Sequence, residues 1–596
     1  MNRKGFRVLL VFLVLGSHAT LKAQEPEFKP KVERRQMAIP LPRIAPGGEV
    51  ASPTMAVPVE DARPFLAIGV TWKPDAGQSL TIYLRGSSDG ETWSEWREVI
   101  VDHDAETPDD AGGMVTLDAE TKYWSYRLVS RAGISPNEIR FSFFSPGETP
   151  EATRNKFLTR MNESPEIQSS PAPRPPVVSR AEWGVPAPPL QSPIYTVVTH
   201  LIVHHTVNNN NSPDWAAVVR SIWNFHVNDR QYNDIGYNYL IDPNGVIYEG
   251  RGGGDNVQGA HFSGVNGGTM GVALLGTFTG IEPSEKAMES LRKLLAWKAD
   301  QRGLIPFGAS PHAVSGLTLK TISGHRDGPG ATECPGDALY ALLPRLRAEV
   351  HNEIVGAAYV TVVNAANYAK DALAAESIVA AFGLNLSGAE LSAPGVPLPV
   401  SLAGASVKVI DQRNAEFAAS LFYVSPQQIN FILPAGMAPG PATILVNNGN
   451  GLVSAGSINL ATVAPAIFTA NASGEGVPAA QLLRIKPDNS FTYEPISTYD
   501  AALKQYVPIT IDLGPETDQV FLVAFGTGMR YRSSLGNVLA LIGGSSKEVL
   551  FVGVSPDYVG LDQVNIRLTR DLIGRGEVVF ELTVDAKAAN PVKLKF

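Results

Sequence analysis

The stretch Val197-Val198-Thr199-His200-Leu201-Ile202-Val203-His204-His205 decides the fold of the central part of this chain. Its β-branched and apolar residues predict a strand, and that strand ends in two adjacent histidines. Neighbouring side chains on a strand point to opposite faces, so at most one of His204 and His205 faces a given site. A functional site is therefore expected at the end of this strand.

Helix and strand patterns follow this strand along the chain. A helix is predicted from Ser212, as its N-cap, through an apolar stripe to Phe225. Residues 237–241 and 246–248 predict a hairpin around an Asp-Pro-Asn-Gly turn. Residues 284–300 predict a further helix with leucines on one face. This alternation predicts an α/β domain with a mixed sheet flanked by helices.

The single cysteine, Cys334, follows Gly324-His325 in a glycine-rich run. It has no internal disulfide partner, so the thiol is inert packing, a nucleophile or a metal ligand. Two imidazoles and a thiolate leave one position of a tetrahedral Zn²⁺ open, which is the catalytic pattern. A lone histidine or cysteine is more often part of a core, so the signal lies in their combination. Seven of the ten histidines gather in this region: His200, His204, His205, His226, His261, His312 and His325.

Six short motifs in the segment 177–356 resemble those of the peptidoglycan recognition protein family, which is similar to phage amidase-type lysozymes. They occur in the family's order and at about its spacing. The motifs are Val203-His204-His205-Thr206, Asp234-Ile235-Gly236-Tyr237-Asn238-Tyr239, Tyr248-Glu249-Gly250-Arg251-Gly252, Gly259-Ala260-His261, Gly324-His325-Arg326 and Thr332-Glu333-Cys334-Pro335-Gly336.

The resemblance implies one Zn²⁺ per chain, held by His204, His325 and Cys334. It also implies a catalytic tyrosine at Tyr237 and a threonine beside the metal at Thr332. Amide cleavage needs an activated water, a stabilised oxyanion and a proton for the departing amine. Tyr237 is suited to orienting the water or donating to the oxyanion, and Thr332 to hydrogen-bonding the tetrahedral centre. Each is alternatively a structural residue with a satisfied hydroxyl.

A muropeptide groove is a further implication of the resemblance, with His226 and His261 in its lining. Either histidine is alternatively part of a helix face or a loop. His205 is expected in the core, because it faces away from His204. The family's residue pair that tracks the third residue of the stem peptide ends at Tyr232 here. That pair differs from the family's usual ones, so Tyr232 is a substrate-binding candidate without a stated stem-peptide preference.

The flanking segments consist of short alternating runs separated by turn signals, which predict all-β sandwich domains on both sides. Trp93 and Trp96 belong to a Trp-Ser-x-Trp motif that resembles sandwich modules found before secreted bacterial amidase domains. Those tryptophans either stack on sugars or pack half-buried at an edge. Runs beginning at Ser377 and Val520 parallel each other, so the C-terminal part predicts tandem immunoglobulin-like units. It resembles a C-terminal module of secreted bacterial proteins.

The expected organisation is a chain of several domains. The proline-rich linker predicts that the central domain folds and acts alone. The expected segments are a signal peptide (1–23), an extended leader (24–60), a β-sandwich accessory domain (61–146), a proline-rich linker (147–176), the amidase domain (177–356) and two immunoglobulin-like domains (357–470 and 471–596).

The first residues carry a basic start and a short apolar run, which predicts a cleaved signal peptide rather than a membrane anchor. The mature protein is expected to be secreted or otherwise extracytoplasmic, with no integral membrane segment. A formal net charge of -9 gives no electrostatic reason to expect a nucleic-acid partner.

The leading hypothesis is an exported zinc-dependent amidase that cuts the bond between N-acetylmuramic acid and L-alanine in peptidoglycan. The alternative is a protein that binds peptidoglycan or muropeptides without cutting them. A third possibility is an adhesive surface protein whose amidase fold is vestigial. The flanking β domains are candidates for binding the cell wall or a surface.

Overall fold

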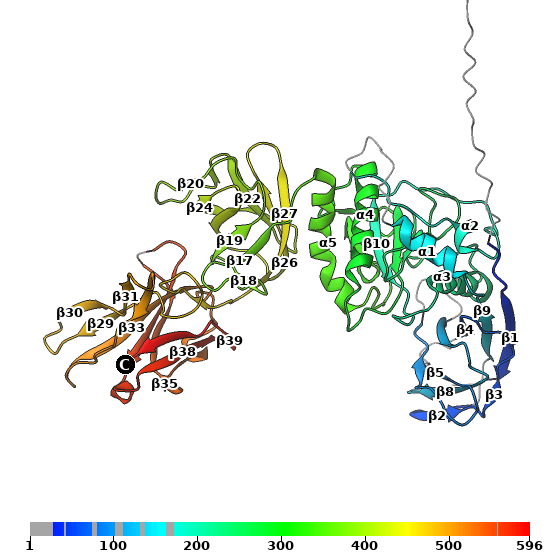
Figure 1. Ribbon diagram of the computed structural model, residues 1–596, viewed down its shortest axis with the longest axis horizontal. Coiled ribbons are helices and arrows are strands. Elements are labelled where there is room, and N and C mark those ends of the chain that lie inside the picture. The colour runs from blue at the N-terminus through cyan, green and yellow to red at the C-terminus, as the bar shows by residue number, and fades with distance from the viewer. Residues whose placement is uncertain are drawn as a thin grey trace, which may run out of the picture.

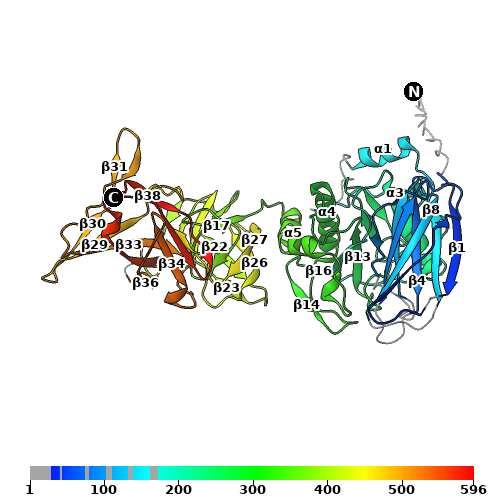
Figure 2. The same cartoon turned by 90° about the horizontal axis from the view of Figure 1, so that it is seen from below.

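The computed structural model describes residues 28–40, 43–73, 80–101, 111–131, 138–161, 172–556 and 558–596. Figure 1 shows a mixed α/β body between an N-terminal β body and two C-terminal β bodies, and Figure 2 shows the same succession after a quarter turn. The signal peptide expected at residues 1–23 lies outside the described residues. Within the described ranges, none of the helices combines the length and apolarity that a membrane span requires.

Two facing sheets form the N-terminal body. One has the order β1 (Glu33–Pro40), β9 (Glu138–Ser145), β4 (Phe65–Trp72) and β7 (Ala111–Asp118). The other has the order β2 (Gly48–Ala51), β8 (Tyr123–Ser130), β5 (Leu80–Ser87) and β6 (Arg97–Glu98), with β3 (Met55–Ala56) also paired to β8. The expectation of a separate leader over residues 24–60 is therefore wrong where the chain is described. β1 pairs along its whole length with β9, because its alternating side chains complete that sheet.

The two tryptophans of the Trp-Ser-x-Trp motif pack against arginines. The Arg85 guanidinium lies 4.5 Å from the ring centroid of Trp93 and 4.3 Å from that of Trp96. Arg127 lies 5.2 Å from Trp96 and 4.6 Å from the ring of Tyr83. A guanidinium over a ring face is attracted by the ring quadrupole and occupies the face that a sugar would use. This geometry favours the packing role over sugar stacking.

The central body is built on a five-stranded mixed sheet in the order β12 (Ile247–Glu249), β11 (Tyr239–Ile241), β13 (Thr269–Leu274), β10 (His200–His205) and β16 (Ile322–Gly324). β10 pairs in parallel with both β13 and β16, and β11 and β12 form the expected antiparallel hairpin. The hairpin of β14 (Ala309–Pro311) and β15 (Thr318–Lys320) lies beside the main sheet.

Helices cover both faces of this sheet, as the alternating pattern predicts. α4 (Glu285–Arg302) and α5 (Asp337–Val355) pack on one face through leucines and valines. α2 (Arg180–Trp183), α3 (Trp215–Asn224) and the π-helix η1 (Phe225–Asp229) cover the other. The N-cap of α3 is Asp214 rather than Ser212, since the Asp214 carboxylate accepts the Ala217 N–H at 3.1 Å.

Two β-sandwiches follow the central body, in agreement with the tandem interpretation. The first has sheets β17–β19–β25–β24–β20 and β18–β27–β26–β22–β21, and the second has β30–β29–β33–β37–β36 and β35–β34–β38–β39. β28 (Ala466–Ile467) already pairs with β33, so the second unit begins before the expected residue 471. Their bounds are β17 (Thr361–Asn364), β18 (Leu373–Ala374), β19 (Ile378–Phe382), β20 (Leu391–Ser392), β21 (Ser401–Leu402), β22 (Ala405–Ile410), β23 (Glu416–Ala418), β24 (Ser420–Val424), β25 (Gln428–Ile432), β26 (Gly440–Asn447), β27 (Val453–Ala461), β29 (Ala480–Ile485), β30 (Phe491–Pro495), β31 (Ser497–Asp500), β32 (Gln505–Pro508), β33 (Gln519–Thr527), β34 (Val538–Ile542), β35 (Ser545–Lys547), β36 (Val549–Val554), β37 (Asp562–Leu568), β38 (Glu577–Val584), β39 (Lys587–Ala588) and β40 (Val592–Lys595).

The internal repeat also appears in the details of strand pairing. β24 meets β25 with a register shift at Leu421/Tyr423, and β36 meets β37 with one at Val549/Phe551. In each unit a glutamine amide donates to an asparagine two residues on, at 2.8 Å in both cases, from Gln428 in the first and Gln563 in the second. The same sequence signature thus produces the same local structure twice.

The end of α5 holds the first of these sandwiches. The Asn352 amide donates to the Ala455 carbonyl at 2.9 Å, and its side-chain oxygen accepts the Ala455 N–H at 2.8 Å. Asn352 thereby bonds both polar backbone groups of one residue in β27. The His351 ring is paired with the Val453 carbonyl of the same strand at 3.1 Å.

The segment expected as a proline-rich linker is folded where it is described. α1 (Glu151–Arg160) packs through Phe157, which is 2% exposed, and Ala172 is part of the core against α4. Phe65 and Phe144 of the N-terminal sandwich share one apolar core with α3. The expected independent core of the central domain is therefore wrong, because burying these aromatic rings joins the two bodies.

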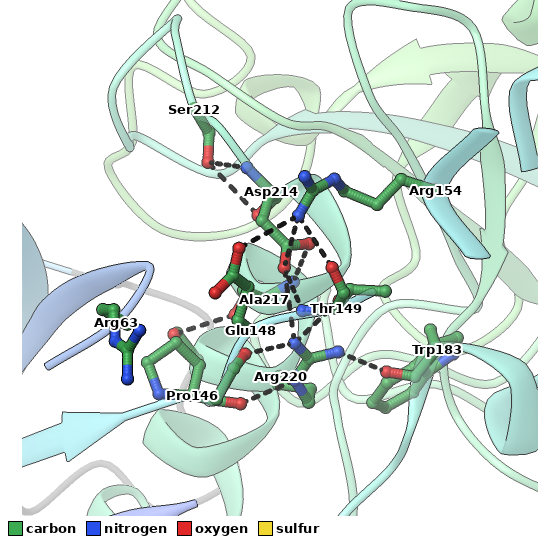
Figure 3. Close-up of polar contacts among 12 residues, drawn as sticks. Arg63, Pro146, Glu148, Thr149, Arg154, Trp183, Ser212, Asp214, Ala217 and Arg220 are labelled. Atoms are coloured by element: carbon green, nitrogen blue, oxygen red, sulfur yellow. Dashed lines mark hydrogen bonds and ion pairs between the residues drawn. The ribbon is translucent and has the colours of Figure 1, made fainter. Parts of the chain in front are cut away.

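A buried arginine on α3 fastens this junction (Figure 3). Arg220 is 0% exposed and donates to the carbonyls of Pro146 at 2.8 Å, Gly147 at 2.6 Å and Trp183 at 2.6 Å. Its guanidinium lies 3.7 Å from the equally buried Asp214 carboxylate. Burial lowers the pKa of Arg220 to about 10, so the group stays charged at neutral pH. One side chain thus binds the exit of the sandwich to the central domain.

Arg220→Met is expected to reduce the free energy of unfolding by about 3–5 kcal/mol, because three buried carbonyls lose their donor and the buried Asp214 carboxylate loses its nearest cation. Urea denaturation of the full chain measures this loss. Arg345→Met is the control: the Arg345 side chain is 64% exposed and, among the described residues, bonds Glu349 alone, four residues on, so about 0.5 kcal/mol or less is expected. Equal effects of the two substitutions would contradict the role of Arg220.

Candidate metal centre and its cleft

Three metal-binding side chains meet where two parallel strands end. Val203 of β10 pairs with Gly324 of β16, so the next residues, His204 and His325, lie side by side at the carboxyl end of this strand pair. Their ring centroids are 4.8 Å apart. Ligand sites in sheets of this kind lie at the carboxyl ends of the strands.

A short loop brings Cys334 back to this pair. The Arg326 N–H donates to the Cys334 carbonyl at 2.9 Å, and the Arg326 guanidinium bonds the Asp337 carboxylate at 2.6 Å and the Glu333 carbonyl. The Cys334 Sγ lies 3.7 Å from His204 Nδ1. One donor atom from each of His204, His325 and Cys334 lies within 4.8 Å of the others, and all three residues are buried. The structure brings together the three expected ligands.

His261 lies behind the metal-binding group rather than in the substrate groove. Its Nδ1 is 3.0 Å from His204 Nε2, and its Nε2 is 3.3 Å from the Thr269 hydroxyl. It is 0% exposed and does not line the cleft, so the expected substrate-binding role is wrong. Gly271 of β13 makes this position possible, because a Cβ there would come within 2.4 Å of the His261 ring.

Burial sets the protonation state of these histidines. It is the main cause that holds the pKa of His204 well below its usual value, and the neighbouring His325 and His261 add to the effect. Burial, with a smaller contribution from the neighbouring His325, lowers the pKa of His261 to about 3. Neutral imidazole is the form that coordinates a metal, so the donor set fits Zn²⁺.

His261→Leu is expected to lower the affinity for Zn²⁺ about 10- to 100-fold, because the partner that fixes the His204 ring is lost. Titration against a chromophoric chelator measures that affinity directly. His312→Leu is the matched control: His312 is also buried, at 1% exposed, but is paired with the Gly267 carbonyl at 2.7 Å and lies outside the metal-binding group. Unchanged affinity in the His261 variant would remove its positioning role.

A cavity of about 770 Å³ opens beside the metal-binding group, and Tyr237 lines it. Tyr237 lies just before β11 and is 6% exposed. Its ring centroid is 5.3 Å from that of His204 and 5.6 Å from that of His226. His226 also lines the cavity, and its Nδ1 accepts the Gly236 N–H at 3.0 Å. Tyr237 and His226 therefore share one cavity beside the metal-binding group.

Tyr232 does not reach this cavity. It is 0% exposed, with its ring centroid 5.1 Å from that of His226, and it is absent from the cavity lining. The expected substrate contact is therefore wrong for Tyr232, which packs behind His226. The π-helix that carries His226 turns that ring toward the cavity; such helices are frequent at functional sites.

Thr332 lines the cavity and is partly buried. Its Oγ1 accepts the Cys334 N–H at 3.1 Å. The hydroxyl therefore stabilises the turn that carries the Cys334 thiol. Both of the expected roles of Thr332, structural and at the reaction centre, are compatible with this position.

Sequence reasoning missed His205 and one entire side of the cavity. His205 lines the cavity and accepts the Phe278 N–H at 3.3 Å, although strand alternation assigned it to the core. It is the last residue of β10, so it lies at the sheet edge where the cavity opens. The opposite side consists of residues from the N-terminal sandwich, including Ile100 and Met114.

Comparisons with known proteins match the segment that carries the metal-binding group. A family model described as N-acetylmuramoyl-L-alanine amidase matches residues 194–337. Peptidoglycan-recognition protein SD of Drosophila simulans is 34% identical over 173 residues, which are 28% of this chain and 84% of that protein. N-acetylmuramoyl-L-alanine amidase of Sus scrofa is 34% identical over 184 residues, 30% of this chain and 28% of that protein. The crystal structure of Drosophila peptidoglycan recognition protein SD has 31% identity and a TM-score of 0.25, covering 28% of this chain and 94% of that one.

Proposed function

The chain belongs to the peptidoglycan-recognition protein family, and we propose that it is an exported, zinc-dependent N-acetylmuramoyl-L-alanine amidase. The observation that carries this proposal is the buried group of His204, His325 and Cys334 at one end of a cavity that Tyr237 also lines. Export rests on the signal sequence expected at residues 1–23. The substrate is peptidoglycan or its muropeptides, cut between N-acetylmuramic acid and L-alanine.

His204, His325 and Cys334 would hold one Zn²⁺, and the donor set of two imidazoles and one thiolate leaves a coordination position open. A metal held in this way supplies Lewis-acid polarisation of the carbonyl and activation of water. His261 holds the ring of His204 from behind, so the direction of Nδ1 toward Cys334 is fixed before any ligand arrives.

Tyr237 is the residue best placed to act on the reacting atoms. It lines the cavity, and its ring centroid is 5.3 Å from that of His204. A phenol hydroxyl in a water-poor cleft donates strongly to a developing oxyanion or orients the attacking water. Thr332 and His226 lie on the same cavity and are available to the tetrahedral centre and to the substrate's polar groups.

Binding without hydrolysis is the second candidate, because relatives named only for recognition match the same segment. The buried thiol of Cys334 favours the enzyme, since a metal-binding group needs it and a peptide groove alone does not.

The two functions separate in one assay. Purified full-length protein is incubated with peptidoglycan, with and without a chelator, and newly exposed N-terminal alanine is quantified. The amidase releases alanine termini, loses this activity to the chelator and regains it with Zn²⁺. Sedimentation of the protein with peptidoglycan in the absence of new termini would establish the binding function instead.

A further inference from the structure

The cavity beside the metal-binding group has two sides from different parts of the chain. Central-domain residues around Tyr237 and Cys334 form one side. The N-terminal sandwich forms the other, with an apolar set of residues from β5, β7 and the segment after β6. That set is Leu80, Val99, Ile100, Val101 and Met114. Thr81 and Glu98 add polar groups from the same side.

The sandwich is held against the central domain at the element that carries His226. β4 lies directly on η1, since a Cβ at Gly69 would be 2.4 Å from Asp229 Oδ2 and 3.0 Å from the Phe225 ring. The Asp229 side chain is 2% exposed, and its carboxylate pairs with Arg34 of β1 at 2.9 Å. Together with the Arg220 cluster of Figure 3, these contacts hold the sandwich beside the cavity.

The two sides of the cavity differ in chemistry. The central side offers imidazole, thiol and phenol groups, which suit the carbonyl and amide of a scissile bond. The sandwich side offers aliphatic carbon, and Ile100 is 45% exposed there. A ligand that covers this isoleucine with apolar surface gains binding free energy, because apolar area is removed from water.

We infer that the N-terminal sandwich is part of the substrate-binding site and that Ile100 and Met114 are specificity-determining residues. The inference rests on the proposed function for the ligand's identity. The linkage between N-acetylmuramic acid and L-alanine carries methyl groups on the lactyl, acetyl and alanyl units. When the scissile carbonyl faces the metal-binding group, these methyl groups contact the sandwich side.

The test compares Ile100→Asp with Val32→Asp in the full chain. Val32 is a matched control, because it is 39% exposed on the same sandwich and does not line the cavity. The KM for a soluble muramoyl-peptide is expected to rise about tenfold in Ile100→Asp, the size of effect that one lost apolar contact produces. The kcat, the zinc content and the melting temperature are expected to stay at wild-type values, and Val32→Asp is expected to match wild type throughout.

A binding arm separates this inference from the proposed function. The Kd of the same muramoyl-peptide is measured by calorimetry for Tyr237→Phe and for Tyr237→Phe with Ile100→Asp. A tenfold weaker Kd in the double variant supports the sandwich contact even if the chain binds without cutting. Met114→Asp repeats the comparison if Ile100→Asp misfolds. Unchanged KM and Kd would overturn the inference, and so would a higher kcat, because the sandwich would then be a cover that hinders the substrate.

Discussion

Cys334→Ser is expected to abolish peptidoglycan hydrolysis and to weaken Zn²⁺ binding severely. Cys334 Sγ is one of three donor atoms that lie within 4.8 Å of one another, and a hydroxyl is a far poorer ligand than a thiolate. Without the metal, several kcal/mol of transition-state stabilisation are lost, so turnover falls to background. Cysteine and serine differ only in the oxygen that replaces sulfur, so the fold is expected to persist.

Metal analysis and melting temperature are measured on the same preparation. His200→Gln provides the control, since His200 is buried on β10, as His204 is, but lies outside the metal-binding group. That variant is expected to keep its zinc and its activity. Full zinc occupancy in Cys334→Ser would show that the ligand assignment is wrong.

Tyr237→Phe is expected to lower kcat about 10²- to 10³-fold, the loss typical of one donor to a developing oxyanion. The phenylalanine ring keeps the packing against His204 and His226. Zinc content is therefore expected to be unchanged. A structural tyrosine would instead show a loss of about 1 kcal/mol in stability with activity nearly intact.

Tyr239→Phe is the matched control for Tyr237. Tyr239 lies two residues further along the chain and is 4% exposed. It packs in the core against Trp297 of α4, on the face of the sheet that α4 and α5 cover. Burial raises the pKa of its hydroxyl to about 12, and among the described residues Tyr239 is not part of the cavity lining. Equal kcat values for the two variants would remove Tyr237 from the catalytic set.

Strand periodicity limited His204 and His205 to one ligand between them, and the family resemblance then selected His204 with His325 and Cys334. His204 near the end of β10 and a glycine-rich turn from His325 to Cys334 meet through local pairing and loop geometry. The same periodicity correctly kept His205 out of the metal-binding group, but it did not show that this last residue of β10 also lines the cavity. His261 and Tyr232 were assigned to the groove by their motifs. In the structure His261 lies behind His204 and Tyr232 lies behind His226, and these positions depend on how the whole sheet packs.

The N-terminal side of the cavity had no signal in the sequence. It depends on how Gly69, Asp229 and Arg34 fit together, and these residues are far apart in the chain. A proline-rich composition suggested a linker, whereas packing of Phe157 and Ala172 folded that segment into the junction. Composition reports how a segment behaves alone, and an apolar surface from another domain overrides it.

Asn352, which bonds both backbone groups of Ala455, gives the C-terminal sandwiches a set direction. They leave from α5, whereas the cleft lies toward the N-terminal sandwich, so the two ends of the molecule point apart (Figure 1). The paired amide bonds of Asn352 fix the angle at which the first sandwich leaves α5 more closely than a flexible linker would. Exchange of the C-terminal units therefore offers a route to changing what the cleft is directed at without altering the metal-binding group.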